Sequence, residues 1–94
     1  MKFNTGTIVA TPGVLEAFER NQQTPMEFLQ RHIAGDWGCV CKEDGLLNDQ
    51  AVIDGSRLLS AYLLKDGTKV WIVTEAVGEN GQREATTFLL PSEY

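Results

Sequence analysis

Apolar residues fall at nearly every second position between residues 57 and 90, and this alternation restricts the fold more than any other feature of the chain. Because a period of two sends successive side chains to opposite faces of a strand, it predicts β-structure. Breaks rich in glycine and polar residues divide the segment into strands over 57–65, 68–76 and 84–90. The Asp66-Gly67 break is typical of a two-residue type I′ turn. We therefore predict a three-stranded antiparallel meander here.

The length of the Asp66-Gly67 turn determines which residues face each other across the hairpin. A two-residue turn predicts Tyr62 opposite Trp71, and a turn after the second strand predicts Val73 opposite Phe88. Tyr62 and Trp71 then lie side by side on one face. Since a small protein seldom leaves so large an aromatic patch in water, we expect either that helices and the first strand cover this face or that it is an interface. If it is an interface, Trp71 is partly exposed and contacts the partner.

Three short helices are predicted before the meander. Thr11-Pro12 and Thr24-Pro25 each place an N-cap threonine before a proline at the first helical position, where the missing amide has no partner in any case. Glu27 has the spacing to complete a capping box with Thr24. The third helix is expected from Asp44 to Gly55, with its leucines largely buried. With a short strand over 5–10, the prediction is one α+β domain over residues 1–94, three short helices packed on a three- to four-stranded antiparallel β-meander.

Charge and composition limit the classes of function. The 94 residues include 8 Lys+Arg and 13 Asp+Glu, a net charge of −5, which argues against a surface for nucleic-acid phosphates. We find neither a signal-peptide pattern nor an apolar run of membrane-spanning length. Cys39 and Cys41 are one residue apart, too close for an unstrained disulfide, so reduced thiols are expected. These features predict a cytoplasmic protein that does not span or bind a membrane.

One group of residues has the chemistry of a zinc site. His32, Cys39 and Cys41 supply imidazole and thiolate, and Asp36 is a fourth candidate ligand. However, structural zinc sites favour a C-x2-C pair, and the C-x-C spacing here cannot easily surround one ion. The expectation is that the protein has no metal and no cofactor.

A second group lies at the end of the second predicted helix. Arg31, His32 and Asp36 contain a His-Asp pair, but catalysis also needs a nucleophile, and neither Ser60 nor Cys39 lies in an activating motif. Orientation of the loop at 36–38 is the simpler role. The carboxylates over 36–54 could imitate nucleic-acid phosphates, although a solvated acidic helix is the simpler interpretation.

Several segments together resemble one family. They are VATPG at 9–13, FLQRHIAGDWG at 28–38, GSRLLSAY at 55–62, DGTKVWIVTE at 66–75 and TTFLLPSEY at 86–94, with Asn48 and Ala51 between them. They resemble small proteins carried on plasmids, integrative elements and prophages, which are labelled plasmid-related or as a type I restriction subunit M. A methyltransferase needs a cofactor-binding sheet, which this pattern does not contain. The relatives have an Asp-Arg-Ser turn where this chain has the longer segment 77–85.

The resemblance implies a non-enzymatic accessory protein of mobile genetic elements that acts by protein–protein interaction. Its sharper form is an inhibitor of a host defence complex, either anti-CRISPR or anti-restriction. The resemblance is also compatible with a homodimer. The alternative is a small-ligand-binding protein or small enzyme with a site around Arg31, His32, Asp36 and Arg57. The candidate binding residues are Arg31, His32, Asp36, Trp37, Asn48, Arg57, Tyr62, Trp71 and Glu75.

Overall fold

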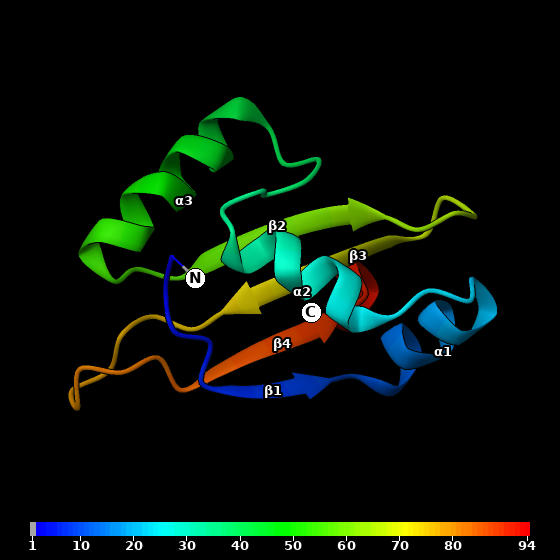
Figure 1. Ribbon diagram of the computed structural model, residues 1–94, viewed down its shortest axis with the longest axis horizontal. Coiled ribbons are helices and arrows are strands. Elements are labelled where there is room, and N and C mark those ends of the chain that lie inside the picture. The colour runs from blue at the N-terminus through cyan, green and yellow to red at the C-terminus, as the bar shows by residue number, and fades with distance from the viewer. Residues whose placement is uncertain (1) are drawn as a thin grey trace.

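The computed structural model describes residues 2–94, which form three α-helices and a four-stranded sheet (Figure 1). The elements, in chain order, are β1 (Thr7–Ala10), α1 (Pro12–Arg20), α2 (Pro25–Ile33), α3 (Lys42–Asp54), β2 (Leu58–Leu63), β3 (Lys69–Thr74), β4 (Ala85–Leu89) and the 3-10 helix η1 (Pro91–Glu93). The α+β class and the β2–β3–β4 meander are confirmed.

The sheet is mixed rather than purely antiparallel, which corrects the prediction. Its strand order is β1-β4-β3-β2, and β1 runs parallel to β4. Alternation within β1 indicates a strand but contains no information on its direction relative to a strand that is far away in the chain. All three helices lie between β1 and the meander, so the chain has ample length to bring β1 alongside β4 in either direction.

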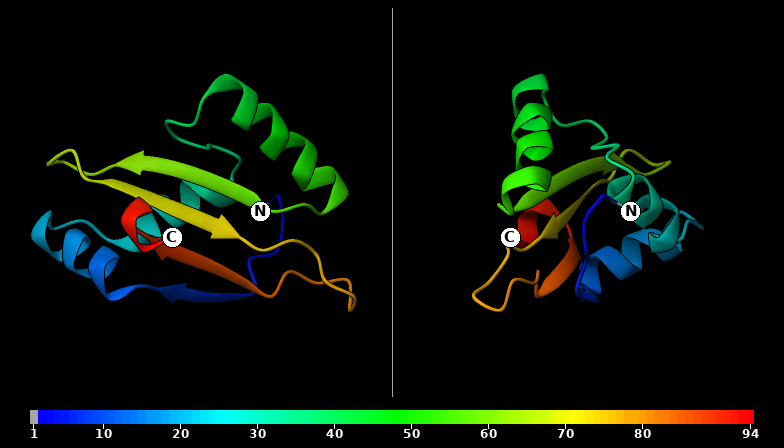
Figure 2. Two further views of the ribbon diagram at one scale, coloured as in Figure 1. Left: turned by 180° about the vertical axis from the view of Figure 1, so that it is seen from behind. Right: turned by 60° about the vertical axis from the view of Figure 1, so that its left-hand side comes forward.

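The two faces of the sheet are covered unequally (Figures 1 and 2). Helices α1 and α2 pack on one face, whereas η1 and the C-terminus lie on the other, and α3 runs beyond the outer edge of β2. The main core lies between the sheet and the first two helices; it contains Val14, Ala17, Phe18, Phe28, Leu29, Tyr62, Leu64, Val70, Ile72 and Phe88. A smaller cluster beside α3 contains Phe3, Trp37, Ala51 and Leu58. The second face is therefore the more open one.

Both predicted helix starts are confirmed, but only one threonine caps its helix with its side chain. The Thr11 Oγ1 accepts a hydrogen bond from the Val14 amide at 3.4 Å. At α2, Thr24 makes no such bond, and the predicted capping box is wrong. The Glu27 carboxylate instead accepts from the side chain of Gln23, one position before the cap, at 3.3 Å.

The predicted register of the meander is wrong by one residue. The hairpin turn has three residues, since the Leu64 amide donates to the Thr68 carbonyl at 2.9 Å and Gly67 lies in the left-handed region. Tyr62 therefore pairs with Val70, and Trp71 pairs with Ala61. The same one-residue shift in the next pair of strands sets Val73 opposite Thr87 rather than opposite Phe88. Tyr62 and Trp71 consequently lie on opposite faces of the sheet.

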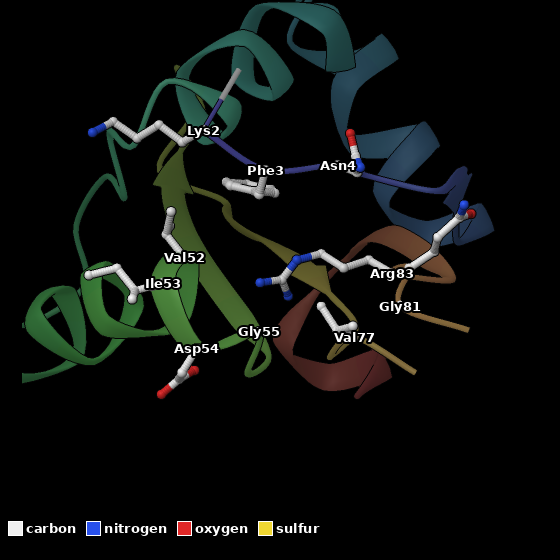
Figure 3. Close-up of a pocket in the computed structure, with 11 residues that line it drawn as sticks. Lys2, Phe3, Asn4, Val52, Ile53, Asp54, Gly55, Val77, Gly81 and Arg83 are labelled. Atoms are coloured by element: carbon white, nitrogen blue, oxygen red, sulfur yellow. The ribbon is translucent and has the colours of Figure 1, made fainter. Parts of the chain in front are cut away.

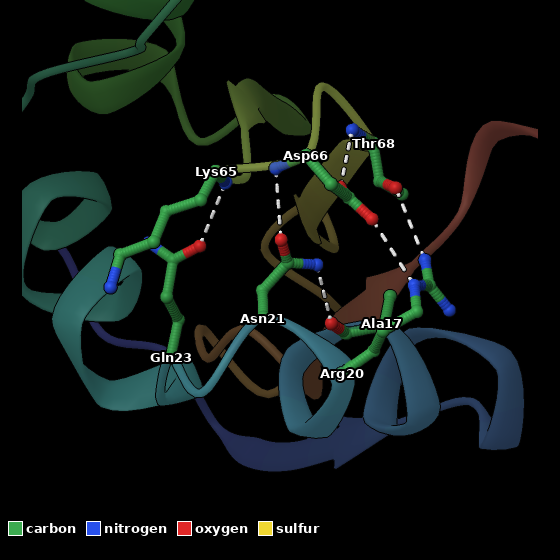
Figure 4. A network of polar contacts seen from close by, with 7 residues as sticks. All are labelled: Ala17, Arg20, Asn21, Gln23, Lys65, Asp66 and Thr68. Atoms are coloured by element: carbon green, nitrogen blue, oxygen red, sulfur yellow. Dashed lines mark hydrogen bonds and ion pairs between the residues drawn. The ribbon is translucent and has the colours of Figure 1, made fainter.

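Contacts from the end of α1 explain the longer turn (Figure 4). The Asn21 Oδ1 accepts from the Asp66 amide at 2.9 Å, and the Gln23 Oε1 accepts from the Lys65 amide at 2.9 Å. Arg20 donates to the Asp66 carboxylate at 3.1 Å and to the Thr68 hydroxyl at 3.2 Å. These bonds satisfy the turn amides from outside the hairpin. A turn of three residues thus becomes favourable where the local sequence alone favours two.

Helix α3 departs from its prediction in position and burial. It begins at Lys42 rather than at Asp44, although it ends at Gly55 as predicted, with φ +84°. Its leucines are not buried, because α3 lies along a sheet edge and contacts the molecule only through one narrow side. The large side chains on the outer side are Leu46, Leu47 and Ile53, which are 59%, 67% and 80% exposed.

Candidate functional site

The structure does not gather the predicted site residues into one site. Four of them are buried, namely His32, Trp37, Asn48 and Tyr62. Four others are exposed, namely Arg31, Asp36, Arg57 and Glu75, and Trp71 is half-buried as predicted. The candidates also lie on different sides of the sheet, because Tyr62, which contacts Arg31 and Asp36, belongs to the helix-covered face and Trp71 to the open face. Each group therefore has to be judged by its own contacts.

His32 belongs to a chain of hydrogen bonds that crosses the core. Its Nδ1 lies 2.5 Å from the Ser60 Oγ, and its Nε2 lies 2.8 Å from the Thr74 Oγ1. The chain continues from Thr74 to the Thr86 hydroxyl at 2.8 Å, and Thr86 donates to the Thr5 carbonyl at 2.8 Å. The imidazole thus links α2 to three strands and to the N-terminal segment.

The direction of each proton in this chain follows from its last bond. The Thr5 carbonyl can only accept, so Thr86 donates to it and must accept from Thr74. Thr74 then accepts from His32 Nε2–H, which leaves Nδ1 as the acceptor for the Ser60 hydroxyl. Burial lowers the pKa of His32 to about 4, with a further contribution from the charge of Arg83. His32 is therefore a neutral imidazole with both nitrogens occupied.

Complete burial separates His32 from any ligand. The side chain is 0% exposed, and Phe3 and Trp37 pack edge-on against its ring. A general base or a zinc ligand needs a nitrogen that can reach a substrate or an ion. The structure assigns His32 to fold stability instead.

Arg31 and Asp36 hold the loop after α2. Their Nε and Oδ2 atoms are 2.7 Å apart, and the Arg31 guanidinium lies 4.7 Å from the centre of the Tyr62 ring. The Tyr62 hydroxyl donates to the Asp36 carbonyl at 2.6 Å, and the Asp36 carboxylate accepts from the Gly38 amide at 3.1 Å. Its hydrogen bond to Arg31 lowers the pKa of Asp36. These groups satisfy one another and leave no free pair for chemistry.

Three further candidates hold neighbouring parts of the fold together. The Asn48 side chain of α3 donates to the Leu59 carbonyl at 2.7 Å and accepts from the Leu59 amide at 3.1 Å. It thus binds both backbone groups of Leu59 in the edge strand β2. The Trp37 indole donates to the Asp49 carboxylate at 3.0 Å. Glu75 contributes its backbone carbonyl, which accepts from Arg83 at 3.0 Å. All three residues connect elements of the fold.

The open face carries an aromatic group that includes Trp71. Its indole meets the Tyr94 ring at a centroid distance of 5.5 Å and an angle of 74°, and the Arg57 guanidinium lies 5.6 Å from the centre of the Tyr94 ring. A hollow of about 210 Å³ beside Arg57 and Leu59 leads to the exposed Leu47 of α3. We call Leu47, Arg57, Leu59, Trp71 and Tyr94 together the Trp71 surface.

Three members of the Trp71 surface, namely Leu47, Leu59 and Tyr94, were missed in the sequence. Tyr94 reaches Trp71 only because η1 turns the C-terminus back across the sheet, which the pattern of the strands does not indicate. Leu47 was assigned to the core, since leucines on a short helix are usually buried. The position of α3 at the sheet edge was the missing information.

Arg83 is another residue that the sequence did not single out. Its side chain is 5% exposed, and Nη1 donates to the carbonyls of Ser56 and Glu75 at 2.7 and 3.0 Å, while Nη2 donates to that of Ala51 at 3.0 Å. It joins the C-terminal end of α3 to the hairpin before β4. A cavity of about 310 Å³ opens beside its guanidinium (Figure 3).

Comparisons with known proteins give no information on the site. No protein-family model, curated protein or solved structure matches this chain. Across residues 2–94, three or more His, Cys, Asp or Glu side chains nowhere come close enough together to hold a metal ion, and Cys39 and Cys41 are free and exposed. Within the same residues, every helix is too short or too polar to cross a membrane.

Proposed function

We propose that the protein acts by binding another protein through the Trp71 surface. The observation that carries the proposal is the contact between Arg57, Tyr94 and Trp71 on the open face of the sheet. Tryptophan, tyrosine and arginine contribute most to binding energy at protein interfaces. The hollow next to Leu59 offers space for a side chain of the partner, and α3 adds the exposed Leu47 at its border.

The charge of α3 indicates the chemistry of the partner. Apart from Lys42 at its start, the charged residues of the helix are all acidic: Glu43, Asp44, Asp49 and Asp54. A partner with a basic rim around an apolar or aromatic contact would match both properties, and opposite potentials accelerate association. Proteins that bind nucleic acid have such basic surfaces. A partner of this class fits the net charge of −5.

The resemblance to proteins of plasmids, integrative elements and prophages supports the biological part of the proposal. In this proposal the protein is a cytoplasmic accessory protein of a mobile element. Its target is a nucleic-acid-binding complex of host defence, of the restriction or CRISPR type. The acidic side of α3 then competes with nucleic-acid phosphates for the basic surface of that complex.

The alternative function around Arg31, His32, Asp36 and Arg57 receives no support from a specific observation. His32 is enclosed, and Arg31 and Asp36 are paired with each other. Arg57 contacts Tyr94 on the opposite face of the sheet.

Co-purification of tagged protein from its native host, followed by binding measurements with the purified partner, tests the proposal. Leu47→Ala and Trp71→Ala should each weaken the complex by about tenfold or more, as for interface residues of high energy. Met26→Ala on α2 removes an equally exposed apolar side chain far from the Trp71 surface and should bind like the native protein. Equal affinity of all three variants would contradict the proposal, as would light scattering that shows only a homodimer closed through this surface.

A further inference from the structure

Arg83 is a buried cation that forms no ion pair within residues 2–94, although the charge of Asp54 acts on it from the border of the cavity. The ion pairs within residues 2–94 are Arg20–Asp66 and Arg31–Asp36, and neither includes Arg83. Burial lowers the pKa of Arg83, but an arginine side chain is not deprotonated in a protein, so the guanidinium remains charged at neutral pH. Taking an arginine out of water without an opposite charge is costly. The site therefore favours an anion.

Two of the five hydrogen-bond donors of Arg83 are unused within residues 2–94. Three donors bind the carbonyls of Ser56, Glu75 and Ala51, which leaves Nε–H and one Nη2–H. None of the fully buried side-chain nitrogen and oxygen atoms of residues 2–94 lacks a hydrogen-bond partner. The Nε of Arg83 is consequently not sealed, and solvent or a ligand can reach it.

The cavity beside these donors has both polar and apolar walls. Its volume is about 310 Å³, close to the lower limit for pockets that bind small molecules. Phe3 covers one side of the guanidinium at 5.7 Å, and Figure 3 shows the Arg83 head group in the centre of the lining residues. Val52, Ile53 and Val77 form the rest of the apolar wall, and the polar wall includes Asn4, Asp54 and Gln82.

We propose that this cavity binds a small monocarboxylate with a short apolar body, whose carboxylate accepts hydrogen bonds from the Nε–H and the free Nη2–H of Arg83. Arginine forms its strongest hydrogen bonds with such planar anions. The apolar body would contact Phe3 and Val77. This site is separate from the Trp71 surface and does not depend on the proposed function.

The charge around the cavity selects a monoanion over phosphate. Arg83 supplies one unpaired positive charge, while the stem of Lys2 lies against Gly35 and Asp54 adds a negative charge at the cavity border. The whole chain has a net charge of −5. A dianion would therefore meet more repulsion than a carboxylate.

Nuclear magnetic resonance titration tests the proposal directly, because the Nε–H of Arg83 gives its own signal. Sodium butyrate should shift this signal saturably, whereas 1-butanol and sodium chloride at equal ionic strength should not. The proposal is overturned if butyrate produces no saturable shift, or if inorganic phosphate saturates the site at lower concentration than butyrate.

Val77 provides a matched pair of variants, since it lies directly opposite Arg83 across the hairpin. Val77→Asp adds a carboxylate that occupies the free donors, and butyrate should bind about tenfold more weakly or worse. Val77→Asn has the same size without the charge and should stay within about twofold of the native affinity. If Val77→Asp does not fold, Ile53→Asp and Ile53→Asn at the exposed border replace the pair. Equal affinity within the folded pair would overturn the proposal.

Discussion

The imidazole of His32 donates its Nε2–H to the hydroxyl of Thr74, 2.8 Å away, although 42 positions separate the two residues in the chain. Through this bond α2 is attached to β3, an interior strand of the sheet. The Ser60 and Thr86 hydroxyls extend the connection on both sides. The stability of the fold therefore depends on a histidine that stays neutral.

We expect the free energy of unfolding to fall as the pH is lowered from 6.5 to 4. Burial holds the pKa of His32 at about 4 in the folded protein, whereas the imidazole in the unfolded chain has its ordinary pKa of about 6.5. Above pH 6.5 the imidazole is neutral in the folded and in the unfolded protein. Between pH 6.5 and pH 4 only the unfolded protein binds the proton, so the free energy of unfolding falls by about 3 kcal/mol over this range. Urea unfolding at several pH values measures this loss. Gln does not titrate, so in His32→Gln the unfolding free energy should depend less on pH. The same dependence on pH between 7 and 5 in both proteins would contradict a buried, neutral His32.

Ser60→Ala should destabilise the protein by about 1–3 kcal/mol, because the Nδ1 of His32 would be left in the core without a donor. Ser92→Ala removes an exposed hydroxyl from η1 and serves as the control. Its effect should remain below about 0.5 kcal/mol. Comparable unfolding midpoints for the two variants would show that the bond between Ser60 and His32 contributes nothing.

The Asn48 side chain can be tested by a change of one atom. Asn48→Asp keeps the acceptor for the Leu59 amide but replaces the donor to the Leu59 carbonyl by a second oxygen. A buried carboxylate facing a carbonyl should cost about 2 kcal/mol or more of unfolding free energy. Gln50→Glu makes the same change on the exposed side of α3 and should be nearly neutral. Thermal unfolding of both variants at pH 7 distinguishes the two cases.

Two glycines with nearly the same backbone conformation should respond differently to alanine. Gly38 and Gly67 have φ values of +75° and +87°, so both substitutions cost about 1 kcal/mol in backbone strain. A Cβ at Gly38 would also collide with the Ala61 carbonyl, whereas one at Gly67 would meet no atom within 4 Å. Gly38→Ala should therefore lower the unfolding midpoint much more than Gly67→Ala. Equal effects would mean that the loop at 36–38 does not lie against β2.

The two helix N-caps should also differ. Thr11→Ala removes the bond to the Val14 amide and one to the Glu93 carboxylate, and we expect a loss of about 1 kcal/mol. Thr24→Ala removes no side-chain cap bond, so its effect should stay below about 0.5 kcal/mol. Denaturant unfolding of the two variants measures the difference. A larger loss from Thr24→Ala would restore the capping box that the sequence suggested.

The local sequence determined the kinds of elements and most of their ends, although α3 begins before the predicted position. Alternation marked the strands, Thr-Pro pairs marked the starts of α1 and α2, and Gly55 marked the left-handed end of α3. Each of these signals acts within a few residues, through φ preferences, missing amides or side-chain period. These local preferences are kept in the folded protein because no contact with a residue far away in the chain competes with them.

Only the tertiary structure decided the register, the direction of β1 and the membership of the candidate sites. Asn21 and Gln23 bind a turn more than 40 residues away in the chain and favour its longer form. The one additional residue in this turn places Tyr62 in the core and Trp71 on the open face. His32, Tyr94 and Arg83 likewise acquire their roles from partners far away in the chain. Distant contacts of this kind depend on how whole elements pack, and one residue of register reverses which side chains face the core.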